Sequence, residues 1–350
     1  MLINMSNRKW KICVIGGGVV GLASALSIRD LNIGTETVDV TVIAEQFGRD
    51  VTSSVAAGLL EPYSVGSPEQ LPLIKKWAMS TWDHINRLNC SEEGRKAGTS
   101  LSFGYNLLEE PDPDYMVGFR EIFFNFQDMS ERELAMFPPY RYGYRFTTLM
   151  ANPARYLPWL TEKLQEKNVT FIKRRVERFE ELAEEYDVIV NCTGVGAAKF
   201  NDARVQPGRG QVTKVHAQWI KHHVVAEKAN GEVSYILPCP DFVALGGVVQ
   251  KGNWNRDVCP DDKKQIWEGC CQLIPSLRDA KIIEDRVGLR PLRDEVRLES
   301  EQITTPIGKK WVVHNYGHGG AGVTLHWGCG KEAAKLVKDC LERVALQSKL

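Results

Sequence analysis

The sequence has no excess of charge of one sign and no long apolar run. Its 44 Lys and Arg residues balance 44 Asp and Glu residues, so the formal net charge is zero. This balance argues against electrostatic capture of nucleic acid or of an anionic membrane. No apolar stretch reaches the roughly 18 residues of a membrane-spanning helix. We therefore expect neither nucleic acid nor membrane as a partner.

The nine cysteines show neither a metal-ligand spacing nor a disulfide framework. Their number is odd, and only Cys270 and Cys271 are adjacent. Free thiols in a reducing compartment and no metal site are therefore the expectation. The short polar stretch before the first apolar run leaves no room for a cleaved signal peptide, so we expect none.

A glycine-rich turn near the N-terminus is the strongest functional signal. It follows the apolar run 11–15 and places Gly16, Gly18 and Gly21 in the pattern G-x-G-x-x-G, and Val19 opens a helical pattern. In a βαβ unit the first glycine allows the tight turn and the second lets phosphates approach. The third lets the helix pack closely, and the helix N-terminus attracts a pyrophosphate. The pattern predicts a dinucleotide site.

An acidic residue follows the next predicted strand. Residues 38–44 read as that strand, and Glu45 and Gln46 come directly after it. A carboxylate at this place suits the hydroxyl groups of an adenosine ribose and repels a 2′-phosphate.

Later segments indicate that the chain leaves this domain and returns to it. Asn152 caps a predicted helix, residues 187–194 form a buried strand that ends at Thr193, and residues 206–288 alternate as antiparallel strands. We predict an α/β protein with a Rossmann-like domain from residues 1–62, 150–205 and 300–345. A second, α+β substrate domain on a mainly antiparallel sheet takes residues 63–149 and 206–299, and residues 346–350 form a C-terminal tail.

A second glycine-rich loop follows the predicted strand near residue 311. Gly317, Gly319, Gly320 and Gly322 precede a helix, so backbone N–H groups can crowd a ligand at a helix N-terminus. A loop of this kind is unnecessary for NAD alone. It suits a flavin, because such donors stabilise the negative charge that a flavin gains on reduction.

These motifs together resemble the D-amino-acid oxidase family, which includes D-aspartate oxidase. The resemblance runs over nearly the full length. It is carried by Ile15-Gly-Gly-Gly-Val-Val-Gly, Val55-Ala-Ala-Gly-Leu, Val190-Asn-Cys-Thr-Gly, Gln206-Pro-Gly-Arg-Gly-Gln, Gly252-Asn-Trp, Gly288-Leu-Arg-Pro and His314-Asn-Tyr-Gly-His-Gly-Gly-Ala-Gly.

The resemblance implies non-covalent FAD and oxidation of a D-amino acid to an imino acid by hydride transfer to the flavin. Oxygen is then reduced to hydrogen peroxide, and the imino acid hydrolyses to a 2-oxo acid and ammonia. Carried over by position, the expected flavin contacts are Gly16, Gly18, Val19, Gly21, Glu45, Gln46, Thr52, Ser53, Ala57, Gly58, Leu59, Arg174, Val176, Thr193, Gly319, Gly320, Ala321, Gly322, Val323 and Thr324.

Two residues match the family's substrate-binding pair. Arg290 matches the arginine that grips the substrate carboxylate, and a guanidinium can do so with two parallel charge-assisted bonds. Tyr235 matches the tyrosine whose hydroxyl assists it. The resemblance requires no acid–base residue, so we interpret His314, His318 and His326 as structural.

Departures from the family pattern bear on the substrate. Val225 and Val249 stand where aspartate-specific relatives carry extra arginines, although the first alignment crosses a loop of different length. Glu61 replaces a glutamine or histidine beside the pocket and, with Gly320, completes the predicted pocket. If ionised there, Glu61 disfavours acidic substrates and favours basic ones; the alternative is that it faces solvent or pairs with an arginine. The family's lid tyrosine has no clear counterpart in residues 227–233.

We therefore expect oxidation of D-amino acids with neutral or basic side chains. The alternatives are a D-aspartate oxidase, a glycine- or sarcosine-type flavin oxidase, an NAD-dependent dehydrogenase and a flavoprotein without turnover. The resemblance also leaves a homodimer open.

The last three residues, Ser348, Lys349 and Leu350, form a peroxisomal import tripeptide. They follow a polar helical tail, and the family carries such a signal. We expect binding to the peroxisomal import receptor and location in the peroxisomal matrix.

Overall fold

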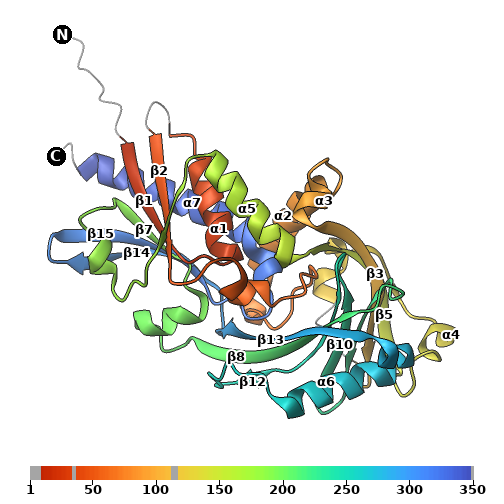
Figure 1. The fold of residues 1–350 in the computed structure, drawn as a ribbon. Helices are drawn as coiled ribbons and strands as arrows, with labels where there is room; N and C mark the ends of the chain where they lie inside the picture. Colours follow the sequence, from red (N-terminus) through yellow and green to blue (C-terminus); the bar gives the residue numbers. More distant parts are fainter. Residues whose placement is uncertain (1–8, 34–36, 112–116, 348–350) are drawn as a thin grey trace, which may run out of the picture.

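The structure is a computed structural model that describes residues 9–33, 37–111 and 117–347. The predicted import tripeptide therefore lies outside the described residues. Two sheets form the framework, one at each end of an elongated molecule (Figure 1). This arrangement confirms the predicted α/β class with a second, sheet-based lobe.

The first sheet has the strand order β14-β15-β7-β1-β2-β6. Its neighbours are parallel except for β14, which runs antiparallel to β15. Its strands are β1 (Lys9–Ile15), β2 (Thr37–Ala44), β6 (Thr170–Lys173), β7 (Val188–Asn191), β14 (Arg297–Thr305) and β15 (Gly308–Tyr316). Because β2 and β7 flank β1 on opposite sides, the strand order reverses at β1, where such folds bind their ligands.

Alternation along β1 divides the core of this lobe into two layers. Ile12 and Val14 pack on the side of α1 (Val19–Arg29), α5 (Pro153–Glu166) and α7 (Gly322–Gln347), and Cys13 and Ile15 belong to the core on the other face. The predicted cap of α5 is present, since the Asn152 side chain accepts a hydrogen bond from the Ala154 N–H at 3.1 Å.

Helix α2 (Leu71–Asn89) connects the two lobes. It buries Ile74, Trp77 and Ile85, and it packs against α7 of the first lobe as well as against strands of the second. The sequence assigned residues 63–149 to the substrate domain, but this helix shares a core with both lobes.

The second sheet has the order β12-β8-β11-β10-β9-β3-β5-β4, and β13 pairs with β8. Its pairs are antiparallel except for β3 and β9. Its strands are β3 (Thr99–Leu108), β4 (Phe124–Asp128), β5 (Tyr142–Ala151), β8 (Gln206–His216), β9 (His223–Glu227), β10 (Val233–Pro238), β11 (Val243–Gly246), β12 (Gln250–Lys251) and β13 (Lys281–Leu292). The remaining α-helices are α3 (Gly94–Ala97), α4 (Glu131–Leu134) and α6 (Pro260–Leu273).

The two faces of this sheet have different partners. Ile236 and Leu245 join the core beneath α6, whereas Leu237 and Ala244, their neighbours in the chain, join a cluster that includes Val55 from the first lobe. The second face therefore looks toward the first lobe.

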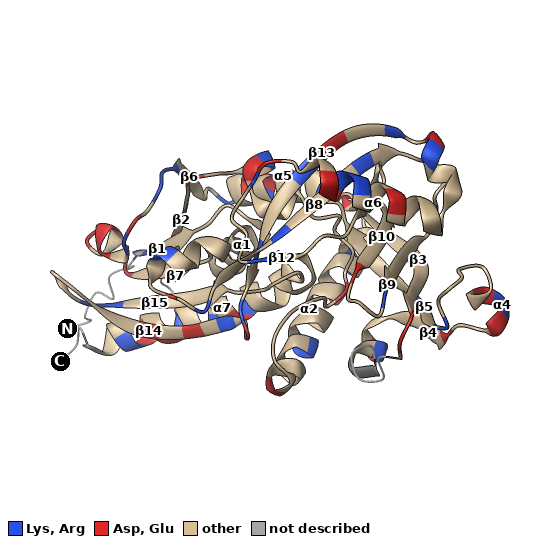
Figure 2. Ribbon diagram, turned by 90° about the horizontal axis from the view of Figure 1, so that it is seen from below, with Lys and Arg blue, Asp and Glu red and all other residues tan. Residues whose placement is uncertain are grey.

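Charged residues of both signs are mixed along the chain (Figure 2). Among the described helices, none combines the length and apolar character needed to cross a bilayer. The nine cysteines are all free, and within the described ranges no cluster of metal-ligating side chains occurs.

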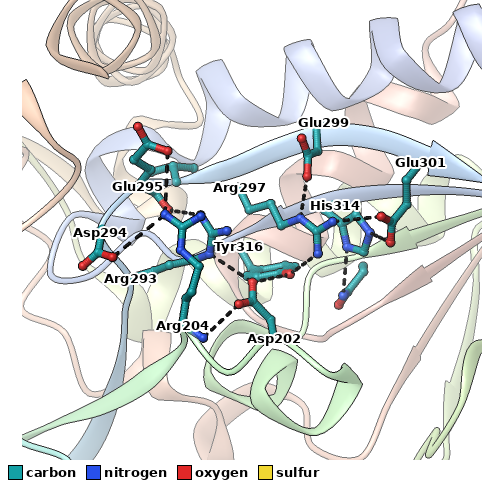
Figure 3. Close-up of polar contacts among 12 residues, drawn as sticks. Asp202, Arg204, Arg293, Asp294, Glu295, Arg297, Glu299, Glu301, His314 and Tyr316 are labelled. Carbon is teal, nitrogen blue, oxygen red and sulfur yellow. Dashed lines mark hydrogen bonds and ion pairs between the residues drawn. The ribbon is translucent and has the colours of Figure 1, made fainter. Parts of the chain in front are cut away.

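A polar network fixes the place where the chain returns from the second sheet to the first (Figure 3). The buried Asp202 carboxylate accepts hydrogen bonds from Arg293 Nε at 3.0 Å, from the Tyr316 hydroxyl at 2.8 Å and from the Arg204 N–H at 3.0 Å. Burial alone would raise the pKa of Asp202, but these hydrogen bonds and the charge of Arg293 lower it overall. The carboxylate is thus held in its charged form.

Replacing Arg293 tests how much this polar network stabilises the fold. Arg293→Ala leaves a buried carboxylate without its cation, and we expect the free energy of unfolding, measured by urea denaturation, to fall by about 3–5 kcal/mol. Arg204→Ala is the control: its guanidinium is half-exposed and lies 3.9 Å from Asp294 and Glu295, so its removal should cost less than about 1 kcal/mol. Equal losses in the two variants would contradict the assignment.

Candidate active site

A cavity of about 450 Å³ extends between the two lobes. It is lined by the carboxyl ends of β1, β2 and β7, by residues between 51 and 63, by the inner face of β8 to β10 and β13, and by the second glycine-rich loop. A volume of this order holds an extended cofactor or ligand.

The predicted glycine pattern builds one part of this cavity. Gly16 has a φ of +129°, and a Cβ there or at Gly21 would strike backbone, the Cys192 carbonyl in the first case and the Gly16 carbonyl in the second. Gly18 precedes α1, and the Val19 N–H donates to the Ser53 hydroxyl at 3.1 Å. The N-terminal turn of α1 therefore opens into the cavity.

Glu45 lies at the carboxyl end of β2, as predicted, and lines the cavity. Its carboxylate lies 3.9 Å from a nitrogen of Arg175, and Arg174, Arg175 and Val176 line the same region. Thr193 is held by its hydroxyl and N–H, which donate to Asn191 Oδ1 at 2.8 and 3.2 Å.

Most residues predicted to touch the cofactor line the cavity, and three do not. Those in the lining are Gly16, Gly18, Val19, Glu45, Gln46, Thr52, Ser53, Ala57, Gly58, Leu59, Arg174, Val176, Thr193, Gly319, Gly320, Gly322 and Val323. Gly21 instead packs α1 against the turn, Ala321 is fully buried, and the Thr324 hydroxyl is occupied by Glu61.

The second glycine loop serves the cavity differently from the expectation. The Gly319 N–H donates to the Pro291 carbonyl at 2.9 Å and the Gly320 N–H to the Ser64 carbonyl at 3.3 Å. These amides tie the loop to neighbours of the substrate residues rather than pointing at a ligand. His318, Gly319 and Gly320 of the loop still line the cavity, and the first turn of α7 follows them at Gly322 and Val323 with its positive dipole.

Arg290 and Tyr235 meet at the other end of the cavity. Both line the cavity, and burial raises the pKa of the Tyr235 phenol while the charge of Arg290 lowers it; Arg290 Nη1 donates to the Val248 carbonyl at 3.0 Å. A Cβ at Gly210 would strike the guanidinium, so this glycine leaves room for it. A cation and a phenol held side by side form a binding site for a carboxylate.

Tyr63 belongs to this site although the sequence did not mark it. Its ring lines the cavity and touches Gly320, and burial raises the pKa of its phenol while the charge of Arg290 opposes that shift. An aromatic residue two positions after Glu61 was the available signal, since alternate residues of an extended segment share a face.

Glu61 is partly buried in the cavity wall, and it forms no ion pair with an arginine in the part of the chain that the structure describes. Its Oε1 accepts a hydrogen bond from Asn106 Nδ2 at 2.7 Å. Its backbone is fixed at both ends by the Thr324 hydroxyl, which accepts from the Glu61 N–H at 3.1 Å and donates to the Glu61 carbonyl at 2.8 Å. Burial raises the pKa of Glu61 to about 7, although the Asn106 bond lowers it.

The two valines of the predicted pocket separate in the structure. Val225 on β9 lines the cavity, whereas Val249 does not and is 37% exposed. Val249 lies between the end of β11 at Gly246 and the start of β12 at Gln250, where strand alternation is interrupted. The structure therefore places Val249 outside the lining of the cavity, away from the predicted pocket.

The histidines considered as bases are buried. His314 bonds to Glu301 at 2.8 Å and His326 to the Tyr156 hydroxyl at 2.8 Å, so both have structural partners. Burial lowers the pKa of His318 to about 3. His318 does line the cavity, and its buried Nε2 has no partner among the described residues.

The residues present fit a dinucleotide cofactor. A glycine cradle opens onto a helix N-terminus, and buried polar atoms of His318 and Asn315 on the wall have no hydrogen-bond partner within the described chain. Such atoms need a polar ligand or ordered water. Fold and site thus define a dinucleotide-dependent enzyme with a carboxylate-binding pocket.

Comparison with known proteins identifies the family. A family model described as FAD dependent oxidoreductase matches residues 11–336. D-aspartate oxidase from Homo sapiens is 36% identical over 95% of both chains. D-amino acid oxidase from Dugesia ryukyuensis is 34% identical over 96% of this chain and 99% of its own. D-amino-acid oxidase from Rubrobacter xylanophilus is 36% identical over 94% of this chain and 96% of its own.

A solved structure agrees on the fold. Glycine oxidase from Bacillus cereus superposes with a TM-score of 0.72 over 94% of this chain and 95% of its own, at 16% identity. The chain belongs to the D-amino-acid oxidase and D-aspartate oxidase family of FAD-dependent oxidoreductases, which confirms the resemblance read from the sequence, and its cofactor is FAD.

Proposed function

We propose that this enzyme oxidises D-amino acids with neutral or basic side chains to imino acids, which hydrolyse to 2-oxo acids and ammonia. The observation that carries the proposal is the Arg290–Tyr235 pair at one end of the flavin cavity. FAD, when bound, would serve as the two-electron acceptor. Oxygen would then take up the two electrons with two protons and give hydrogen peroxide.

The side chains contribute position rather than proton transfer. Arg290 and Tyr235 fix the α-carboxylate, and a fixed carboxylate restricts the orientation of the Cα–H bond. The walls around it exclude water: Val225, Leu237 and Val212 present apolar surface from the second sheet. The preference for D over L substrates rests on the relatives' names and not on a contact in this site.

An acidic side chain fits this pocket poorly. In the described cavity wall Val225 offers no charge to a second carboxylate, and Glu61 would repel one. D-aspartate oxidase is therefore the second candidate, favoured by the 36% identical human relative and opposed by these two residues.

A substrate panel tests the proposal. Hydrogen peroxide release from the FAD-loaded enzyme is measured with D-alanine, D-arginine and D-aspartate and with their L-forms. We expect activity on the first two and little on D-aspartate or any L-form. A preference for D-aspartate would select the second candidate, and inactivity on all six would reject both.

Arg290→Ala tests the assignment of the carboxylate site. Losing the charged partner of a desolvated carboxylate should cost about 2–5 kcal/mol in kcat/KM for D-alanine. Tyr235→Phe removes one neutral hydrogen bond and should cost about 0.5–1.5 kcal/mol. Arg256→Ala is the matched control, because Arg256 is exposed and lines the same cavity. If Arg256→Ala showed the larger loss, the carboxylate would lie elsewhere.

We propose the peroxisomal matrix as the location, reached through an import receptor that binds Ser348, Lys349 and Leu350. A fusion with a fluorescent protein at the N-terminus should co-localise with a peroxisomal marker in cells. Deletion of the three residues should disperse it, and unchanged localisation would contradict the proposal.

A homodimer is a further proposal, supported by the exposed apolar side chains of Leu101 and Phe103 on β3 and of Phe124 on β4.

A further inference from the structure

Four strands of the second sheet place one row of residues beside the substrate pocket, and two of these residues, Val225 and Tyr235, line the cavity. Asn106 on β3 lies opposite Val225 on β9, Val225 opposite Tyr235 on β10, and Tyr235 opposite Gly246 on β11. Residues directly opposite one another project from the same face of a sheet. The row therefore leads from the carboxylate site at Tyr235, over Val225, to Asn106.

Glu61 lies next to Asn106, at the end of the row away from Tyr235. Its carboxylate lines the cavity and accepts the bond from Asn106, which is itself buried and whose Oδ1 has no partner among the described residues. The Thr324 bonds fix the Glu61 backbone, and the Asn106 bond holds its side chain. An acid is thus fixed opposite the cation that holds the substrate carboxylate.

The charges that surround Glu61 come from several elements. Tyr63 lies on the same segment, Tyr235 on β10, Arg290 on β13, the exposed Arg256 after β12 and His318 in the loop before α7, and all five line the cavity; Glu227 at the end of β9 acts on Tyr63. Burial raises the pKa values of both tyrosines above 10 and lowers that of His318 to about 3. These three are therefore neutral at pH 7, where Glu61 itself changes charge.

We propose that Glu61, positioned by Asn106, forms a cation-binding subsite that selects D-amino acids with long basic side chains such as D-arginine. This inference rests on the proposed oxidation of D-amino acids. It assigns the residue that sets the substrate class, and it makes that preference depend on the charge of Glu61.

The length of the row suits this substrate. Strands lie about 4.8 Å apart, and the Tyr235 ring leans over Gly246, so the path from its hydroxyl to Asn106 covers roughly 10–14 Å. D-arginine spans roughly 7 Å from carboxylate to guanidinium and, with a hydrogen bond at each end, bridges roughly 13 Å. Val225 beneath the path gives the methylene stem an apolar floor.

The pH dependence of a substrate ratio tests the subsite. D-citrulline has nearly the shape of D-arginine but a neutral ureido group, and both react through the same α-amine, so the ionisation of that amine cancels in the ratio. The ratio of kcat/KM for D-arginine to that for D-citrulline should be near one at pH 5.5–6. It should rise about 10- to 100-fold through pH 7 as Glu61 loses its proton.

Three variants separate Glu61 from other causes. Glu61→Gln keeps an acceptor for Asn106, so the ratio should stay near one at every pH. Asn106→Leu removes a bond that lowers the pKa of Glu61, so the rise should move to higher pH. Glu69→Gln removes an exposed carboxylate nearby in the chain and should leave the wild-type profile unchanged.

A binding measurement gives a readout without turnover. The probes are 5-guanidinopentanoate and 5-ureidopentanoate, which lack the α-amine and cannot be oxidised, and their affinities for the FAD-loaded enzyme are read from changes in flavin absorbance. At pH 8 the guanidino compound should bind at least tenfold more tightly, and this difference should vanish in Glu61→Gln.

The outcomes distinguish a failure of the Glu61 subsite from a failure of the proposed oxidase function. If D-alanine and D-citrulline are oxidised but the D-arginine ratio does not change with pH or with Glu61→Gln, the subsite is refuted and the oxidase function stands. If no D-amino acid is oxidised, the oxidase function fails and the inference about its specificity fails with it.

Discussion

The buried ion pair between Arg293 and Asp202 fixes how the two lobes meet, and the geometry of the site follows from it. Arg293 belongs to the segment that returns from β13 to β14, and its side chain lies against Gly317, where a Cβ would have little room. Two residues further on, the Gly319 N–H holds the carbonyl of Pro291, the neighbour of Arg290. The distance between Arg290 and the second glycine-rich loop therefore depends on the Asp202 carboxylate, which three hydrogen-bond donors keep charged.

The cavity carries opposite charges at opposite ends of its substrate pocket. On the proposed function, Arg290 offers a cation to the α-carboxylate, whereas Glu61 offers an acid whose pKa burial raises to about 7. A substrate with a carboxylate at each end would meet repulsion at one of them. Sequence identity of 36% to a D-aspartate oxidase and of 36% to a D-amino-acid oxidase does not distinguish these substrates, so individual side chains must decide between them.

Local signals in the sequence predicted much of the fold and the cofactor half of the site. The glycine turn, the strand before Glu45 and the Asn152 cap each depend on neighbouring residues, so the pattern identified them. Long-range contacts were not predictable in this way. Thr324 bonds to Glu61 across 263 positions in the chain, and Gly319 and Gly320 use their N–H groups on Pro291 and Ser64. Val249 left the pocket because the strand ends before it.

The buried histidines define what the reaction does not use. His326, with its pKa lowered to about 4, and His318, with its pKa lowered to about 3, are neutral at physiological pH, and a base so weak gives little help in removing a proton. His314 is engaged by Glu301 and Asn191, away from the cavity lining. On the proposed function, orientation of the substrate by Arg290 and Tyr235, and not proton transfer by these histidines, carries catalysis. On the proposed subsite, a pH dependence of substrate selection near neutrality originates in Glu61, whose pKa burial raises to about 7.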